Sequence, residues 1–293
     1  MKVSFGSWAF SFGPYSRHPI PLEKVAEKLA ATGYDGIELC GFPPYVTPNR
    51  YPTPAERRLL ASRLEGLNLS VSSYVPDFTM VNPVVEANRD RYLDVFRCNL
   101  EICHDLGSPS LRVDSIAAPG SILDAEYLDC FRRVAALWHD AAEIAATAGI
   151  RIIWEFEPGF VFNKPSEIVE MYERVGHPNF QILFDTGHAY LCGVIGARQH
   201  GDAETLDGGV CEFLQLLSGR IGHIHLADTD GTLYGDETTT HCPLGAGSLD
   251  WKRIGPLLKA IPAVEWWCVD LSFWPGSWDL LESSLSFVRQ LMA

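Results

Sequence analysis

Carboxylates and histidines recur where apolar, strand-like segments end, and their types and spacing suit chemistry. Glu155 and Glu157 stand two residues apart at the end of an apolar run that begins at Ile150, so on a strand both side chains point to the same side. Neighbouring carboxylates repel each other unless a cation, a proton or solvent relieves them. A divalent metal ion is the economical cation, and contact with water is the alternative interpretation.

Another acidic residue and a histidine follow the next apolar run. Asp185 and His188 are three residues apart across Gly187, so both side chains can project to the same place. Carboxylate oxygen and imidazole nitrogen together suit manganese, zinc or magnesium. The alternatives are a helix N-cap for Asp185 and a hydrogen-bonded loop histidine for His188.

Two histidines and two further carboxylates lie on other apolar runs. His223 and His225 share one face of the run 221–226. His225, nearer its end, is the candidate ligand and the deeper His223 the candidate to orient it; hydrogen-bonded core histidines are the alternative interpretation. Asp270 follows an apolar run, where an unpaired buried carboxylate is costly, unless it forms a salt bridge or a cap. Glu38 is predicted either to hydrogen-bond substrate or to support the rim of the fold.

Eight short apolar segments must position these residues, and they alternate with longer segments of helical periodicity. We predict strands over residues 3–8, 36–39, 69–74, 110–113, 150–156, 181–185, 221–226 and 265–270. We predict helices over residues 22–31, 54–66, 84–106, 125–148, 165–175, 210–217, 251–260 and 278–291.

This alternation predicts a single α/β domain over residues 1–293, a (β/α)8 TIM barrel. No linker or composition shift divides the chain, and no GxGxxG follows an early strand as in an open nucleotide-binding sheet. Barrels of this kind carry their chemistry at the carboxyl ends of the strands. The acidic and histidine residues above should therefore meet at one mouth, and no GxSxG or GxxxxGK[ST] motif competes with them.

The sequence resembles the xylose-isomerase-like barrel superfamily, which holds sugar isomerases and epimerases, inosose-type dehydratases and endonuclease IV. The resemblance runs from Asp35-Gly-Ile-Glu38-Leu through Gly245-Ala-Gly247 to the last strand. Its most specific pieces are the glutamate of strand five, the Asp-x-x-His of strand six and the His-x-x-Asp of strand seven.

The resemblance implies a set of site residues. One divalent ion, Mn²⁺ first and Zn²⁺, Mg²⁺ or Co²⁺ as alternatives, would be held by Glu155, Asp185, His225 and Asp270. The catalytic residues would be Glu155, Asp270 and His188. Those in contact with substrate would be His188, Glu157, Glu38 and His241. Glu155 is preferred as ligand because it lies six residues after Gly149, as the family's ligand commonly does, and Glu157, directly before Pro158, is its rival.

Two departures from the family pattern narrow the function. Asp270 stands where the family usually has glutamate, so its carboxylate reaches about one methylene less far and is a doubtful proton acceptor. Endonuclease IV needs three zinc ions and histidines on strands three and four, but the segments 73–76 and 112–114 contain none. Lys and Arg number 23 against 37 Asp and Glu, a formal charge of −14 that repels nucleic acid.

These observations predict an enzyme, a metal-dependent isomerase or epimerase that acts on a sugar, ketose or polyol through an enediolate. The first alternative is a dehydratase or lyase acting on a keto-cyclitol or related hydroxyketone. The second is a non-catalytic barrel that binds metal or sugar as a subunit of an assembly. The expected partner is a small molecule, and the sequence leaves a homo-oligomer open.

The sequence also predicts a cytoplasmic protein that does not engage membranes. Its eight cysteines form no CxxC pair, as expected for buried thiols in a reducing compartment. The first ten residues are too short and polar for a signal peptide. No apolar run reaches the roughly 18 residues that a transmembrane helix needs.

Overall fold

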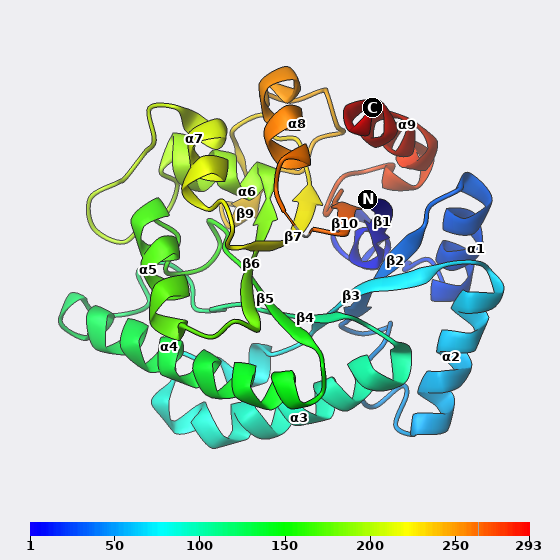
Figure 1. The fold of residues 1–293 in the computed structure, drawn as a ribbon, viewed down its shortest axis with the longest axis horizontal. Helices are drawn as coiled ribbons and strands as arrows, with labels where there is room; N and C mark the ends of the chain where they lie inside the picture. The colour runs from blue at the N-terminus through cyan, green and yellow to red at the C-terminus, as the bar shows by residue number, and fades with distance from the viewer. Residues whose placement is uncertain (263) are drawn as a thin grey trace.

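The structure, a computed structural model, describes residues 1–262 and 264–293. In this part of the chain eight parallel strands close into a barrel in the order β1-β10-β7-β6-β5-β4-β3-β2 (Figure 1). Their bounds are Lys2–Gly6 (β1), Gly36–Gly41 (β2), Ser70–Pro76 (β3), Ser110–Val113 (β4), Arg151–Glu155 (β5), Phe180–Asp185 (β6), Ile221–Leu226 (β7) and Trp266–Val269 (β10). The predicted TIM barrel is confirmed.

Helices surround the barrel (Figure 1). Their bounds are Leu22–Thr32 (α1), Pro54–Gly66 (α2), Arg89–Leu106 (α3), Asp124–Thr147 (α4), Pro165–Val175 (α5), Thr186–Tyr190 (α6), Gly209–Leu216 (α7), Trp251–Lys259 (α8) and Leu281–Met292 (α9). Thr53 and Glu56 form a capping box at the start of α2. α5 ends at Val175 and is capped by Gly176, whose left-handed φ of 56° a glycine adopts without strain. No helix in the described ranges is long and apolar enough to cross a bilayer.

Two predicted boundaries differ from the structure for local reasons. The predicted strand 3–8 ends at Gly6, because Ser7–Phe10 forms a 3-10 turn and the Ser7 hydroxyl accepts a hydrogen bond from the Cys40 amide at 2.9 Å. The helix predicted from residue 84 begins at Arg89. There Asn82 accepts a hydrogen bond from the Val84 amide at 3.1 Å, which turns the chain before the helix begins.

Aromatic packing fixes the strands that bear the acidic residues. Trp138 of α4 packs on Trp154 of β5 and on Phe180 of β6, with ring centroids 5.3 and 5.8 Å apart. Because side chains alternate along a strand, Trp154 faces the helix layer while Glu155 turns inward. The packing therefore sets the orientation of the neighbouring carboxylate.

Two short strands and a short helix are among the elements that escaped the sequence analysis. Leu233–Tyr234 (β8) and Thr238–Thr239 (β9) pair as an antiparallel hairpin in the connection after β7, and α6 follows β6 directly. Strands of two residues show no periodicity, and α6 has only five residues. The hairpin contacts α6, so it lies at the end of the barrel where the strands point.

Candidate metal and substrate site

Three neighbouring strands bring a carboxylate, a second carboxylate and a histidine together. Glu155 and Asp185 are the last residues of β5 and β6, and His225 lies on β7 opposite Asp185. One ligand atom from each lies within 4.8 Å of the others. The three side chains are buried, with at most 1% of their surface exposed. The predicted convergence of these three residues is thus present in the structure.

The facing atoms of this cluster lack hydrogen-bond partners. Among the described residues, Oε1 of Glu155, Oδ2 of Asp185 and Nδ1 of His225 are buried with none, although Nδ1 and Oε1 stand only 2.8 Å apart. Unpartnered buried polar atoms are costly. Two carboxylate oxygens and an imidazole nitrogen are a donor set that divalent metals accept, so the residues fit such an ion.

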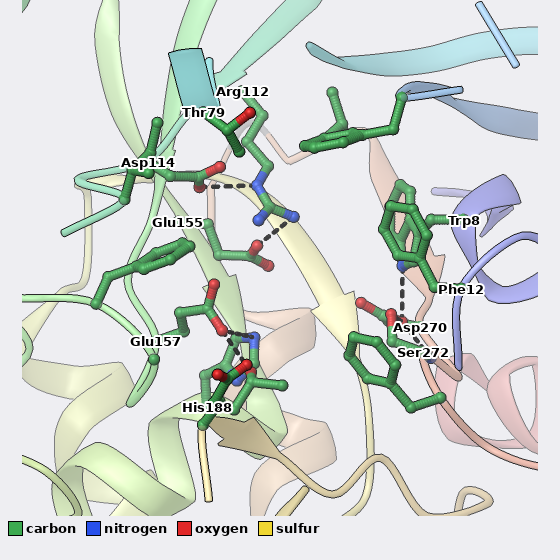
Figure 2. Close-up of a pocket in the computed structure, with 18 of the residues that line it drawn as sticks. Trp8, Phe12, Thr79, Arg112, Asp114, Glu155, Glu157, His188, Asp270 and Ser272 are labelled. Carbon is green, nitrogen blue, oxygen red and sulfur yellow. Dashed lines mark hydrogen bonds and ion pairs between the residues drawn. The ribbon is translucent and has the colours of Figure 1, made fainter. Parts of the chain in front are cut away.

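Asp270 stands at the edge of this cluster with one oxygen fixed. Oδ1 accepts hydrogen bonds from Trp8 Nε1 at 2.9 Å and from the amide and hydroxyl of Ser272 at 2.7 Å each (Figure 2). Oδ2 lies 3.8 Å from His225 Nδ1 and 3.8 Å from His241 Nε2. Burial raises the pKa of Asp270, but the two histidines and the hydrogen bonds outweigh it and lower the pKa overall. Asp270 can therefore offer the site one oxygen.

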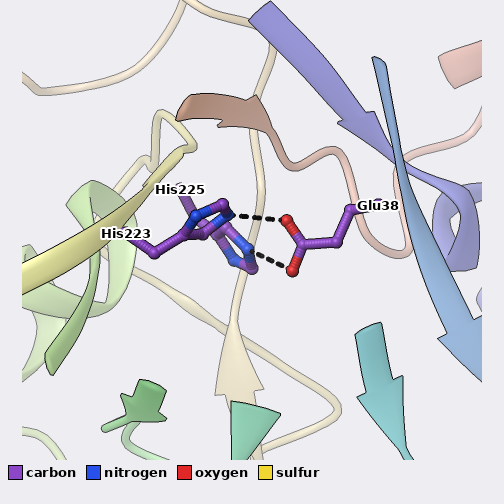
Figure 3. Close-up of side chains that lie close together, drawn as sticks. All are labelled: Glu38, His223 and His225. Atoms are coloured by element: carbon purple, nitrogen blue, oxygen red, sulfur yellow. Dashed lines mark hydrogen bonds and ion pairs between the residues drawn. The ribbon is translucent and has the colours of Figure 1, made fainter. Parts of the chain in front are cut away.

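A carboxylate from the other side of the barrel supports His225 from behind. Glu38 of β2 is fully buried, with Oε1 3.1 Å from His225 Nε2 and Oε2 2.8 Å from His223 Nε2 (Figure 3). Burial opposes its ionisation, yet the two histidines hold the pKa of Glu38 well below its ordinary value. The residues that line the cavity do not include Glu38 in the described part of the chain. Glu38 is therefore placed to support the histidines, and its contact with substrate stays a prediction.

Arg112 of β4 is a site residue that the sequence analysis did not select. Its Nε donates to Asp114 Oδ1 at 2.8 Å, and its Nη1 forms an ion pair with Glu155 Oε2 (Figure 2). Burial lowers the pKa of Arg112, but the two carboxylates raise it well above its ordinary value. The available signal was an arginine within the apolar strand Ser110–Val113. Arg112 leaves Oε1 of Glu155 as the oxygen that faces the cluster.

The hairpin β8–β9 orients two more predicted residues. His188 Nδ1 lies 2.7 Å from Thr239 Oγ1, and the Thr238 hydroxyl donates to Glu157 Oε2. That carboxylate oxygen is 3.9 Å from His188 Nε2. Burial lowers the pKa of His188 well below its ordinary value, whereas burial, together with Glu155, raises the pKa of Glu157 to about 8.

A cavity of about 450 Å³ lies above these groups. Three of the four residues predicted to contact substrate line it, namely His188, Glu157 and His241. Both ring nitrogens of His241 are buried, and neither has a hydrogen-bond partner among the residues described. The polar floor faces an aromatic wall made by Trp8, Phe12, Phe42, Phe78, Phe160 and Phe273. Such a cavity suits a small molecule with several hydroxyl groups and an apolar face.

Comparison with known proteins agrees with this architecture. The family described as Xylose isomerase-like TIM barrel matches residues 26–290. The 2-oxo-tetronate isomerase of Pectobacterium atrosepticum is 27% identical over 246 residues, which cover 79% of this chain and 82% of that protein. The inosose dehydratase of Yersinia enterocolitica is 27% identical over 151 residues, 49% of this chain and 47% of that protein.

The fold is also similar to that of solved barrels. The structure of D-psicose 3-epimerase with D-tagatose from Clostridium cellulolyticum H10 superposes with a TM-score of 0.76 over 100% of this chain and 99% of that chain. The two sequences are 14% identical. At this identity the similarity shows the shared barrel fold.

Proposed function

Because the chain belongs to the xylose isomerase-like TIM barrel family, we propose that it is a divalent-metal-dependent isomerase or epimerase. Its substrate would be a sugar, ketose or polyol. The observation that carries the proposal is the cluster of three buried, unpartnered ligand atoms from Glu155, Asp185 and His225 beneath the cavity. The names of the related isomerase and epimerase support the reaction class.

The ion would be held by Glu155, Asp185 and His225, with Oδ2 of Asp270 beside them. Mn²⁺ is the first choice, with Zn²⁺, Mg²⁺ and Co²⁺ as alternatives. A bound divalent ion supplies Lewis-acid stabilisation of the negative charge that develops when a proton leaves carbon next to a carbonyl group.

The chain's own groups would bind the substrate and move the proton. Glu155 lies at the floor of the cavity and is the proposed base, positioned there by its ion pair with Arg112. Thr239 occupies Nδ1 of His188, so Nε2 is the nitrogen left to orient or protonate a substrate oxygen. Glu157 lies beside that nitrogen and is placed to hydrogen-bond the same part of the substrate.

Asp270 is better suited to hold the ion and the cavity wall than to accept a proton from carbon. Three hydrogen bonds to Oδ1 stabilise the carboxylate form. A proton on Asp270 would have to displace one of these donors or reside on Oδ2, the oxygen that faces His225 and His241. We therefore assign proton transfer to His188 and to Glu155, whose Oε1 has no hydrogen-bond partner among the described residues.

A dehydratase acting on a keto-cyclitol or related hydroxyketone is the second candidate. The fixed carboxylate of Asp270 favours it, because eliminating a hydroxyl group next to the same enediolate needs no base on the opposite face of the substrate. The inosose dehydratase relative supports this alternative. A non-catalytic barrel that binds metal or sugar is the third candidate.

One experiment separates these functions. The metal-loaded protein is incubated in deuterated water with ketoses, 2-oxo sugar acids and keto-inositols. Deuterium incorporation without loss of water indicates an isomerase or epimerase, whereas an enone absorbance indicates the dehydratase. Retained metal binding without turnover of any substrate supports the non-catalytic barrel. Full metal content in Glu155→Gln, Asp185→Asn and His225→Gln alike would show that the proposed site is wrong.

A further inference from the structure

Glu38 is a carboxylate in the barrel interior whose two oxygens face two histidines. It is fully buried, as is His225, and His223 is 2% exposed. Oε1 lies 3.1 Å from His225 Nε2, and Oε2 lies 2.8 Å from His223 Nε2 (Figure 3). A charge buried this deeply persists only where hydrogen bonds and opposite charge compensate its loss of water. Its hydrogen-bond partners are both on β7, 185 and 187 residues away in sequence.

The chemistry of this contact settles where the protons sit. An ionised carboxylate accepts hydrogen bonds and has no proton to donate. Nε2 of His225 must therefore carry its hydrogen toward Glu38. In a neutral imidazole the other nitrogen, Nδ1, then keeps its lone pair.

That lone pair points at the proposed metal site. Nδ1 of His225 is 2.8 Å from Oε1 of Glu155 and has no hydrogen-bond partner in the described ranges. Two lone pairs at this distance repel each other unless a proton on Nδ1 or a metal ion lies between them. The contact between Nε2 and Glu38 on one side of the ring is therefore consistent with metal binding by Nδ1 on the other side.

His223 keeps the carboxylate from rotating. It occupies the second oxygen of Glu38, and its ring meets that of His225 edge to face, with centroids 5.4 Å apart. Both oxygens of Glu38 are thus satisfied from one strand. This explains why β7 carries two histidines of which one lies in the cluster of donor atoms beneath the cavity.

We propose that Glu38, held by His223, is a positioning residue that fixes the tautomer and the ring orientation of His225 so that Nδ1 faces the metal ion. This rests on the proposed function in one respect, that His225 is a ligand. Groups that orient a ligating histidine in this way commonly change metal affinity by about 10- to 100-fold when they are lost.

Zinc binding to the metal-free protein tests the proposal. The dissociation constant of Zn²⁺ is measured by competition with a chromophoric chelator for the wild type and for Glu38→Leu, Glu38→Gln and Glu38→Asp. We expect zinc to bind about 100-fold more weakly to Glu38→Leu and about 10-fold more weakly to Glu38→Gln, which loses the charge and keeps one acceptor oxygen. Glu38→Asp retains an ionised acceptor and should recover part of the affinity.

The tautomer gives a second readout that general loosening of the fold would not move. Long-range proton–nitrogen correlation spectra of the zinc-loaded, histidine-labelled protein should show His225 protonated at Nε2 and coordinated through Nδ1. In zinc-loaded Glu38→Leu the Nε2–H signal should lose its hydrogen-bonded chemical shift, or the ring should coordinate through Nε2 instead. Glu167→Leu is the matched control, because Glu167 also accepts a side-chain hydrogen bond, from Tyr127 at 2.9 Å, on α5 outside the site. Its zinc affinity should equal that of the wild type.

The outcomes separate this proposal from the proposed function. If Glu38→Leu does not fold, Glu38→Gln decides, and wild-type zinc affinity in Glu38→Gln overturns the positioning role while the metal site stands. Coordination of wild-type His225 through Nε2 would also overturn it. Unchanged zinc content in His225→Gln would instead show that His225 is not a ligand and that the proposed site fails.

Discussion

Replacing Arg112 with leucine is expected to destabilise the metal-free protein by about 3–5 kcal/mol, the usual cost of removing one partner of a buried ion pair. Arg112 binds Asp114 at 2.8 Å and forms an ion pair with Glu155, and the three side chains are 14%, 13% and 1% exposed. Without the guanidinium, two neighbouring carboxylates remain in a place that water barely reaches. Each must lose its charge or unfold the structure around it.

The free energy of unfolding is measured by urea denaturation at pH 7 with a chelator present, so that no metal ion compensates. For a chain of this size the loss corresponds to a fall in melting temperature of roughly 6–20 °C. Arg58→Leu is the matched control. Arg58 also binds a carboxylate at 2.8 Å, that of Asp105, but it is 62% exposed, so its removal should cost less than about 1 kcal/mol.

A loss in Arg112→Leu no larger than that in Arg58→Leu would refute this reasoning. It would mean that Glu155 or Asp114 is already uncharged in the folded protein. Adding Mn²⁺ gives a further check, since a cation beside Glu155 should restore part of the lost stability. No recovery would show that the ion does not reach Glu155.

Three further predictions follow from the same cluster. Burial lowers the pKa of His225, but nearby carboxylates raise it well above its ordinary value. Burial also raises the pKa of Asp185. Each of the two residues must therefore release a proton before it binds a metal ion. Calorimetry should therefore show Mn²⁺ binding tenfold to a hundredfold more tightly per pH unit, and equal affinity at pH 6 and 8 would contradict this. The pKa of Glu157 is about 8 in the folded protein, so above about pH 4.3 its ionisation favours the unfolded chain. Between pH 5 and 9 this should cost the wild type about 4 kcal/mol of stability, a loss that Glu157→Gln should remove. If urea denaturation showed the same change in the free energy of unfolding between pH 5 and 9 for the wild type and for Glu157→Gln, the prediction would be contradicted. Thr239→Val leaves His188 Nδ1 without its partner at 2.7 Å and should cost about 1–3 kcal/mol in urea denaturation, whereas a cost below 0.5 kcal/mol would mean that a water takes the hydroxyl's place.

The parts of the site that the sequence predicted depend on local periodicity. Glu155, Asp185 and His225 each end or nearly end an apolar run, and parallel strands of a barrel bring such ends together. The two interpretations of Asp185 turned out to be compatible. Its Oδ1 accepts the His188 amide at 2.7 Å as a helix N-cap, while Oδ2 faces the cluster.

The parts that escaped prediction depend on contacts across the barrel or on elements too short to show a pattern. Glu38 meets His225 only because closure of the barrel sets the side chains of β2 and β7 facing each other across its interior. Arg112 meets Glu155 because β4 pairs with β5. The sequence around either residue does not predict this ion pair. Thr239 belongs to a strand of two residues, where periodicity carries no information.

Asp270 links the sequence and the chemistry most directly. From sequence, the shortened carboxylate on the last strand already made a second proton acceptor doubtful. In the structure, Trp8 and Ser272 hold Oδ1, and so strengthen that argument by stabilising the carboxylate form. Epimerisation needs proton transfer on both faces of a carbon, whereas aldose–ketose isomerisation and elimination through an enediolate can use one base on one face. Because Glu155 lies at the base of the cavity and hydrogen bonds hold Asp270 at its side, the geometry favours reactions that use one base, aldose–ketose isomerisation or elimination, over epimerisation.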